Sequence, residues 1–247
     1  MTLNGKRIVI TRAAHQSADF AALLIAEGAL PLAYPAIQIV PPADIRPLDI
    51  ALAVTQAGGF DWIVFTSVNA VQAIAARISR IPAGTRIAVI GATTAKAVKT
   101  HLGLTPEVMP EDGHLLDALS LGDDDRVLLP QSEIAPLALE QGLRERGIDV
   151  TAVSAYTVIT GSGGVDLPAQ KQVDAITFTS GSTVEHFLKR YLNEGGSFSA
   201  LERVPLACFG RSARTALKAA GLSPAISAET NALTALVTAL KDYFHAE

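Results

Sequence analysis

Short clusters of hydroxyl, amide and glycine residues recur in this chain, each where an apolar run gives way to an amphipathic one. They are Thr11-Arg12, Thr66-Ser67-Val68-Asn69, Gly91-Ala92-Thr93-Thr94, Pro130-Gln131-Ser132, Thr179-Ser180-Gly181-Ser182 and Gly210-Arg211-Ser212-Ala213. Hydroxyls and free N–H groups at the start of a helix bind anions, because the positive end of the helix dipole adds to the hydrogen bonds. Glu133 is the only carboxylate residue within or directly beside these clusters, so the pattern favours a negatively charged ligand.

Serine, threonine and asparagine are also the preferred residues at helix starts, where their side chains cap free N–H groups. The clusters therefore predict helix caps as well as ligand contacts, and the sequence leaves both interpretations open. The candidate ligand-binding residues are Arg12, Thr66, Ser67, Asn69, Thr93, Thr94, Gln131, Ser132, Ser180, Gly181, Ser182, Arg211 and Ser212.

Familiar catalytic motifs do not occur in the sequence. The histidines show no metal-ligand spacing, and they are His15, His101, His114, His186 and His245. Cys208 is the single cysteine and lies in an apolar run typical of a buried core residue, so no internal disulfide can form. No nucleophile elbow, Walker A loop or dinucleotide-binding glycine motif follows an apolar run. An enzyme with this sequence would act by positioning its substrate more than by strong acid–base chemistry.

The clusters need a scaffold, and the apolar runs before them predict one. Short β-rich runs alternate with Ala- and Leu-rich helical patterns, the order typical of parallel sheets covered by helices. Strands are expected at 7–11, 62–66, 86–90, 127–130, 175–179 and 205–209, and helices at 17–27, 68–78, 93–102, 134–146, 183–191, 212–220 and 231–244. Ligands of such sheets bind at the carboxyl ends of the strands, which is where the clusters fall.

A stretch near residue 60 is repeated near residue 173. Residues 60–74 align without gaps with residues 173–187, and the identical pairs are Asp61/Asp174, Ile63/Ile176, Phe65/Phe178, Thr66/Thr179, Ser67/Ser180 and Val71/Val184. Residues 86–103 correspond to 204–221, and residues 7–28 to 126–147. A repeat of this extent predicts two similar α/β lobes with a cleft between them. Two extended segments at matching places, 35–42 and 154–160, are candidate linkers between the lobes.

Composition excludes several classes of protein. Hydrophobic residues make up 49% of the chain and charged residues 18%, which suits packed cores and not a disordered chain. The net charge is −4 without a basic cluster, so nucleic acid is not an expected partner. Charged or polar residues interrupt every apolar run before it reaches membrane-spanning length, and no signal-peptide core is visible. We therefore expect a soluble, cytoplasmic protein with no membrane partner.

Taken together, the motifs resemble the uroporphyrinogen-III synthase family. The resemblance extends from about Lys6 to the last helix and is carried by Ile8-Val9-Ile10-Thr11-Arg12, residues 65–71, residues 178–182, residues 90–95 and Ala155-Tyr156-Thr157. Gln131-Ser132 and Arg211-Ser212-Ala213 depart from it, since the family often has Arg-Gly and Pro-Thr-Thr there.

The resemblance implies two α/β domains joined by a two-stranded connector, with the active site in the cleft between them. Domain 1 would combine residues 1–35 with 161–247, domain 2 would span 41–155, and the linkers would be about 36–40 and 156–160. The repeated sequence units and the folded domains would then be out of phase.

The resemblance also implies a reaction. Hydroxymethylbilane, a linear tetrapyrrole polycarboxylate, would be cyclised to uroporphyrinogen III with loss of water and inversion of its last ring, without a metal or organic cofactor. Tyr156 matches the family tyrosine proposed to help the hydroxyl leave, and Arg12 and Arg211 would be the charged partners of the substrate carboxylates. A monomer is expected.

Two other functions fit parts of the pattern. Duplicated α/β lobes with an extended hinge also suit a two-lobed receptor for a small anion. A nucleotide-dependent α/β transferase is the other alternative, although the phosphate loop that it would need is missing.

Overall fold

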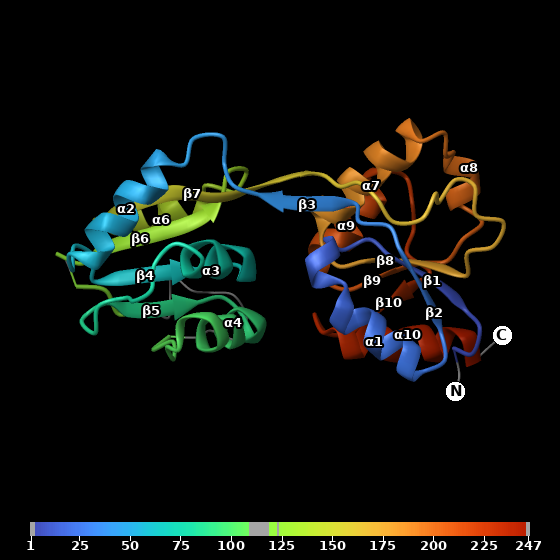
Figure 1. The fold of residues 1–247 in the computed structure, drawn as a ribbon, viewed down its shortest axis with the longest axis horizontal. Helices are drawn as coiled ribbons and strands as arrows, with labels where there is room; N and C mark the ends of the chain where they lie inside the picture. Colours follow the sequence, from blue (N-terminus) through green and yellow to red (C-terminus); the bar gives the residue numbers. More distant parts are fainter. Residues whose placement is uncertain (1–2, 109–118, 123, 246–247) are drawn as a thin grey trace. The chain divides into compact units, whose positions relative to one another are not determined.

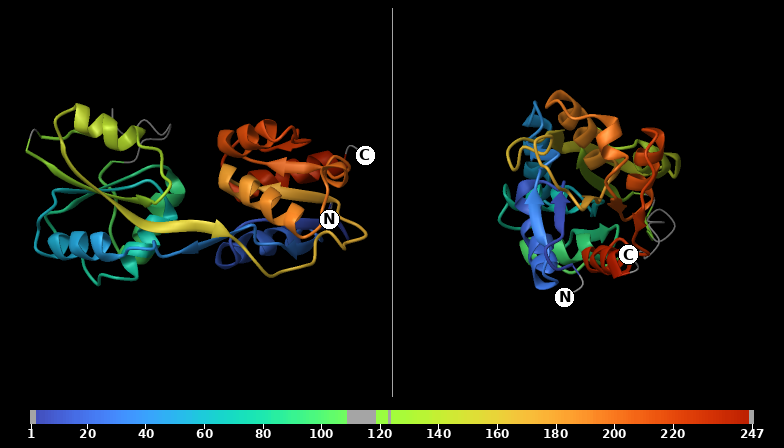
Figure 2. Two further views of the ribbon diagram at one scale, coloured as in Figure 1. Left: turned by 90° about the horizontal axis from the view of Figure 1, so that it is seen from above. Right: turned by 90° about the vertical axis from the view of Figure 1, so that its right-hand side faces the viewer.

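The computed structural model describes residues 3–108, 119–122 and 124–245. His114 lies outside the described residues. The chain divides into two compact units, one formed by Met1–Gln38 with Ile159–Glu247 and the other by Ile39–Val158. Each unit holds a five-stranded sheet with helices on both faces (Figure 1; Figure 2). In the part of the chain that the structure describes, no helix is long and apolar enough to cross a membrane.

The first unit has the strand order β10-β9-β8-β1-β2. Its strands are β1 (Arg7–Ile10), β2 (Leu30–Ala33), β8 (Ala175–Phe178), β9 (Leu206–Cys208) and β10 (Ile226–Ser227). Its helices are η1 (Ala14–Gln16), α1 (Ala18–Ala26), α7 (Gly181–Asn193), α8 (Phe198–Leu201), α9 (Arg211–Ala219) and α10 (Leu233–His245). All strand pairs in this sheet are parallel.

Alternating residues of β1 pack into two cores, one on each face of the sheet. Ile8 and Ile10 contact the core formed with α1 and α10, whereas Val9 contacts the core formed with α7 and α9. This alternation follows from the two-residue period of a strand. Each fully buried isoleucine or valine contributes about 1.5–3 kcal/mol to stability, so the near-continuous apolar runs specify strands buried on both faces.

The second unit has the strand order β3-β7-β6-β4-β5. Its strands are β3 (Ile37–Val40), β4 (Trp62–Phe65), β5 (Arg86–Val89), β6 (Arg126–Ser132) and β7 (Asp149–Thr160). Its helices are α2 (Arg46–Gln56), α3 (Val68–Ala75), α4 (Ala92–Leu102) and α6 (Ala138–Glu145). Ile63 and Phe65 of β4 pack with α2, α3 and α4, whereas Trp62 and Val64 pack on the opposite face with Leu143 of α6.

Each sheet is built from strands of both repeated halves of the sequence. In the first sheet β2-β1 from the first half are followed by β8-β9 from the second, and in the second sheet β7-β6 from the second half are followed by β4-β5 from the first. The chain passes from one unit to the other within strand β3 and again within strand β7, and these two strands are neighbours in one sheet. The repeated segments therefore occupy equivalent positions in different units.

The predicted parallel α/β fold is confirmed, but the structure adds strands β2 and β10 and helices η1, α2 and α8 to the expected elements, and the candidate linker segments 35–42 and 154–160 contribute to strands β3 and β7. Helix α2 was not expected, although Pro47 near its start and the buried Leu48, Leu52 and Thr55 on one face are sufficient signals for it. Strand β2 was also missed, because Pro31 masks an edge strand that tolerates proline. Helix α6 begins at Ala138 and not at residue 134, because Pro136 disfavours helical geometry in the residue before it.

Candidate functional site

The candidate site residues gather at one edge of each sheet. Since neighbouring strands run parallel, their carboxyl ends meet at the same edge, which we call the carboxyl edge of the unit. The carboxyl edge of the second unit carries residues 66–69 after β4, residues 91–94 after β5 and Gln131-Ser132 at the end of β6. The carboxyl edge of the first unit carries Arg12 after β1, residues 180–182 after β8 and residues 210–212 after β9.

In the second unit, the side chain of Ser67 contacts Tyr156. The Oγ of Ser67 and the hydroxyl oxygen of Tyr156 lie 3.1 Å apart. The same Oγ accepts a hydrogen bond of 3.2 Å from the backbone N–H of Ala70 and caps helix α3. Tyr156 is 8% exposed, and its ring belongs to the core that contains Phe65 and Val71. The structure thus connects two residues that lie 89 positions apart in the sequence.

Strand β7 brings Tyr156 to this edge. Tyr156 is paired with Ser132 of β6, and the pairing shifts register between Gln131 and Ser132. The backbone N–H of Glu133 donates a hydrogen bond of 2.9 Å to the carbonyl of Tyr156, which fixes the strand where β6 ends. The Oγ of Ser132 accepts a 3.5 Å bond from the N–H of Ile134, and Gln131 is half-buried. Ser132 therefore lies beside the tyrosine on the neighbouring strand, and Gln131 is paired with Ser154.

Helix α4 presents its first turn at the same edge. Its N-cap is Gly91, whose φ of +80° lies in the left-handed region that favours glycine, and no side chain caps the helix. Thr93 is exposed, whereas Thr94 is 5% exposed and offers little surface to a ligand. Thr66, just before α3, and Asn69, in its first turn, are half-buried. The start of α4 is thus available for an anion, in line with the general preference of helix N-termini.

In the first unit, Arg12 follows Thr11 at the end of β1. Thr11 is fully buried, and its hydroxyl donates a 2.6 Å hydrogen bond to the carbonyl of Thr177 in β8. The Nε atom of Arg12 is buried and has no hydrogen-bond partner among the described residues. Burial lowers the pKa of Arg12, and attraction to Asp19 opposes this change. A half-buried guanidinium with an unused donor is suited to bind a carboxylate.

Ser180 is the counterpart of Ser67 and caps helix α7. Its Oγ accepts a 3.2 Å bond from the N–H of Thr183, and the Thr183 side chain accepts from the N–H of Ser180, so a complete capping box forms. The Oγ atoms of Ser180 and Ser182 lie 3.0 Å apart. The hydroxyl of Ser180 is therefore used within its own loop.

Gly181 and Ser212 join two neighbouring loops of the first unit. The N–H of Gly181 donates a 3.1 Å hydrogen bond to the Oγ of Ser212, and a Cβ atom at position 181 would lie 2.7 Å from that oxygen. Arg211 and Ser212 are exposed, and Gly210, with a φ of +77°, is the N-cap of α9 without a side-chain cap.

The structure separates the two interpretations of the polar clusters. Ser67 and Ser180 cap helices, whereas Gly91 and Gly210 begin helices that no side chain caps. Asn231 was missed by sequence reasoning, and its Oδ1 lies 2.9 Å from the position a Cβ would take at Gly210. No sequence pattern connects residue 231 with residue 210.

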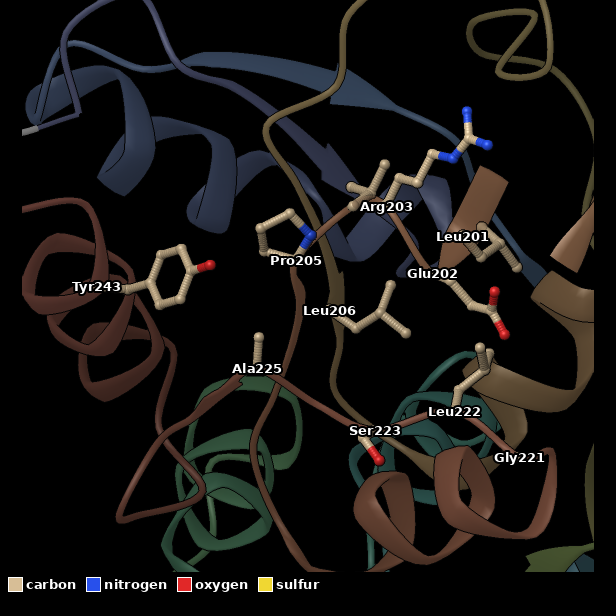
Figure 3. Close-up of a pocket in the computed structure, with 11 residues that line it drawn as sticks. Leu201, Glu202, Arg203, Pro205, Leu206, Gly221, Leu222, Ser223, Ala225 and Tyr243 are labelled. Atoms are coloured by element: carbon tan, nitrogen blue, oxygen red, sulfur yellow. The ribbon is translucent and has the colours of Figure 1, made fainter. Parts of the chain in front are cut away.

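A separate cavity of about 380 Å³ lies in the first unit. Figure 3 shows it at the beginning of β9, where Tyr243 faces Pro205 and Ala225. This is the opposite end of β9 from Gly210 and Ser212, and none of the predicted site residues lines it. The cavity is therefore distinct from the carboxyl edge.

Comparisons with known proteins identify the relatives of this chain. A 204-residue alignment with uroporphyrinogen-III synthase of Synechococcus elongatus is 35% identical and covers 75% of this chain and 74% of the relative. A crystal structure of a mutant uroporphyrinogen III synthase from Thermus thermophilus superimposes with a TM-score of 0.65 at 22% identity, covering 98% of this chain and 100% of the other. The enzyme structure from Helicobacter pylori 26695 gives a TM-score of 0.58 at 15% identity and covers 97% and 99%.

The two structural likenesses show that the fold is shared, and the sequence matches show more. The family profile described as uroporphyrinogen-III synthase HemD matches residues 18–238, which span both units and every candidate site residue except Arg12. The sequence resemblance is thereby confirmed. The family match favours the synthase over the two alternatives, an anion receptor and a nucleotide-dependent transferase. This chain belongs to the uroporphyrinogen-III synthase family.

Proposed function

We propose that this chain catalyses the cyclisation of hydroxymethylbilane to uroporphyrinogen III, with loss of water and inversion of the last ring. The observation that carries the proposal is the family match over residues 18–238, which includes every candidate site residue except Arg12. Members of this family are enzymes of tetrapyrrole biosynthesis. Because water is eliminated as the ring closes, the reaction class is that of a lyase.

The reaction needs a good leaving group and controlled geometry. A proton passes to the terminal hydroxyl of the substrate. The C–O bond then breaks with electrons supplied by the pyrrole nitrogen, water departs, and an electrophilic methylene remains. The substituted carbon of the last ring attacks this methylene, and the spiro intermediate reopens and closes inverted. One proton enters with the leaving water and one is released on closure. The steps therefore balance without a redox partner.

Tyr156 is the proposed proton donor to the leaving hydroxyl. Its hydroxyl lies at the carboxyl edge of the second unit beside Ser67, while its ring is held in the core. A phenol is a weak acid, but a leaving group that is pushed by a pyrrole needs only modest help. Most of the catalysis is then conformational, since the enzyme holds the chain in the one geometry that inverts the ring.

The carboxylates of the substrate would bind at both carboxyl edges. In the first unit, Arg12 offers a half-buried guanidinium and Arg211 an exposed side chain, with Ser180, Gly181, Ser182 and Ser212 beside them. In the second unit, Thr66, Asn69, Thr93, Gln131 and Ser132 offer hydroxyls and amides, whereas Thr94 is buried. Few of these groups are charged, so binding would depend on many hydrogen bonds and on helix starts.

The resemblance supports a two-domain arrangement in which both carboxyl edges bind one substrate molecule. Domain 1 would comprise residues 1–35 and 161–247, domain 2 residues 41–155, and a two-stranded linker residues 36–40 and 156–160. One molecule of the protein would then be sufficient for activity, in keeping with the expectation of a monomer.

An isomer assay tests the proposal directly. The purified protein is incubated with freshly prepared hydroxymethylbilane, and the products are oxidised and separated by chromatography. We expect the type III isomer, whereas the same substrate in buffer or with heat-inactivated protein gives type I. Type I product alone in the presence of the native protein would reject the function.

A further inference from the structure

We propose that Ser67 is a positioning residue that orients the hydroxyl of Tyr156, and is not itself a contact for the substrate. This inference rests on the proposed function, because it assigns a role within the same reaction. It is carried by the 3.1 Å distance between the two hydroxyl oxygens and by the second bond that fixes Ser67 in place.

The hydrogen bonds of Ser67 determine how it acts on Tyr156. A serine hydroxyl offers one donor and two acceptor sites. One acceptor site takes the N–H of Ala70 at 3.2 Å, so the rotamer of Ser67 is fixed by the helix cap. Either hydroxyl of the pair can donate; in the proposed role the O–H of Ser67 donates to the phenol oxygen, which leaves the phenol proton free to point at a substrate hydroxyl. When that proton is transferred, the hydroxyl of Ser67 donates to the phenolate oxygen.

The sequence repeat provides an internal comparison. Ser180 holds the equivalent position in the first unit with the same extended backbone, φ −160° and ψ 162° against φ −153° and ψ 152° for Ser67. There, Thr183 and Ser182 surround the cap oxygen, and a complete capping box is formed. In α3 the third helical residue is Ala70, which has no hydroxyl to complete such a box. Ser67 therefore contacts the hydroxyl of the distant Tyr156, whereas Ser180 contacts the hydroxyl of Thr183 in its own helix.

Burial of the Tyr156 ring allows Ser67 to orient the tyrosine hydroxyl. The ring of Tyr156 packs in the core with Phe65 and Val71, which restricts the ring, and the backbone carbonyl accepts from the N–H of Glu133. The hydroxyl hydrogen can still rotate about the C–O bond, and packing of the ring does not restrict this rotation. A neighbouring hydroxyl at hydrogen-bond distance restricts it, and small misplacements of a catalytic group are costly in rate.

Two substitutions at Ser67 separate positioning from stability. Ser67→Gly removes the hydroxyl but places a residue that is tolerated at the N-cap. Ser67→Ala removes the hydroxyl and places a residue that is unfavourable at the N-cap. We expect kcat to fall about tenfold in both variants, with KM within about twofold of wild type, since the lost hydrogen bond acts on the transition state. Ser67→Thr retains the hydroxyl and is expected to restore kcat. Ser197→Ala is the matched control, because Ser197 caps α8 through the N–H of Ala200.

A double-mutant cycle gives the decisive result. If Ser67 acts through Tyr156, then Ser67→Gly combined with Tyr156→Phe will have the kcat of Tyr156→Phe alone. Multiplicative losses in kcat, or a raised KM at unchanged kcat for Ser67→Gly, would overturn the positioning role and leave the proposed cyclisation intact. Wild-type protein that forms only type I product would overturn both the function and this inference.

Discussion

The backbone N–H of Gly181 donates a 3.1 Å hydrogen bond to the Oγ of Ser212, which joins the first turn of α7 to the first turn of α9. Both helices begin at the carboxyl edge of the first unit, so this bond fixes two of its loops relative to each other. The contact is tight enough that a Cβ atom at position 181 would lie 2.7 Å from the same oxygen.

Gly181→Ala is expected to separate these loops. The added methyl group displaces Ser212, and the protein loses about 1 kcal/mol of stability despite the better helix propensity of alanine. KM for hydroxymethylbilane should rise several-fold while kcat changes less. Chemical denaturation and steady-state kinetics measure the two effects. Gly84→Ala is the control, since a Cβ there meets nothing within 4 Å; equal behaviour of the two variants would contradict the prediction.

Arg12→Met should weaken substrate binding without destabilising the protein. Burial lowers the pKa of Arg12 and its Nε has no partner among the described residues, so removal of the charge relieves a desolvation cost. KM is expected to rise about tenfold or more, because a charge-assisted hydrogen bond to a carboxylate is lost. Kinetics and thermal unfolding provide the readouts. A large fall in melting temperature would show that Arg12 is structural.

Tyr156→Phe should reduce kcat at least tenfold and leave the fold intact, because only a partly buried hydroxyl is removed. The residual product should remain type III, since the groups that bind the substrate are unchanged. The coupled isomer assay measures both rate and isomer ratio. Tyr243→Phe, in α10 and beside the separate cavity, is the matched control (Figure 3). Unchanged turnover of Tyr156→Phe would remove the tyrosine from the mechanism.

Arg190→Met should destabilise the first unit by about 3–5 kcal/mol, as expected when a buried charged network loses its centre. Arg190 is 7% exposed, and it donates to the carbonyls of Pro35 and Gly163 at 2.8 and 2.7 Å and to Glu194 at 2.8 Å. The substitution removes the Arg190 donors of both carbonyls and one of the two side-chain donors to Glu194, which keeps the hydrogen bond from Tyr34. Arg77→Met removes a more exposed pair with Asp49 and should cost less than about 1 kcal/mol. Similar denaturation midpoints for the two variants would contradict this prediction.

Stability should also depend on Glu194 at acidic pH. Burial raises the pKa of this carboxyl, but hydrogen bonds from Tyr34 and Arg190 outweigh burial, so the pKa is lowered in the folded state. A carboxyl with a lowered folded pKa stabilises the protein above the unfolded value of about 4.3, and this stabilisation is lost as the pH falls through the folded pKa. In denaturation curves between about pH 7 and 3, Glu194→Gln should show a weaker loss of stability than wild type. Parallel curves would exclude this contribution.

The sequence predicted the scaffold because the signals involved are local. The buried runs before Thr11, Thr66 and Thr179 specify strands, and glycines at helix starts such as Gly91 and Gly210 specify turns. Parallel strands in turn place their carboxyl ends at one edge, so the set of candidate residues followed from pattern and fold class. Among the elements that were missed, β2 is obscured by its proline, whereas α2 has an amphipathic face that is a sufficient signal.

Tertiary structure decided which of these residues act together. The bond between Ser67 and Tyr156 depends on strand pairing of β4 with β6 and of β6 with β7, and the bond between Gly181 and Ser212 depends on the packing of α7 beside α9. Side-chain partners of this kind are set by long-range register and packing, for which local sequence carries no signal. The sequence by itself therefore determined most of the elements and the family resemblance, and the fold assigned Ser67, Ser180 and Ser212 their different partners.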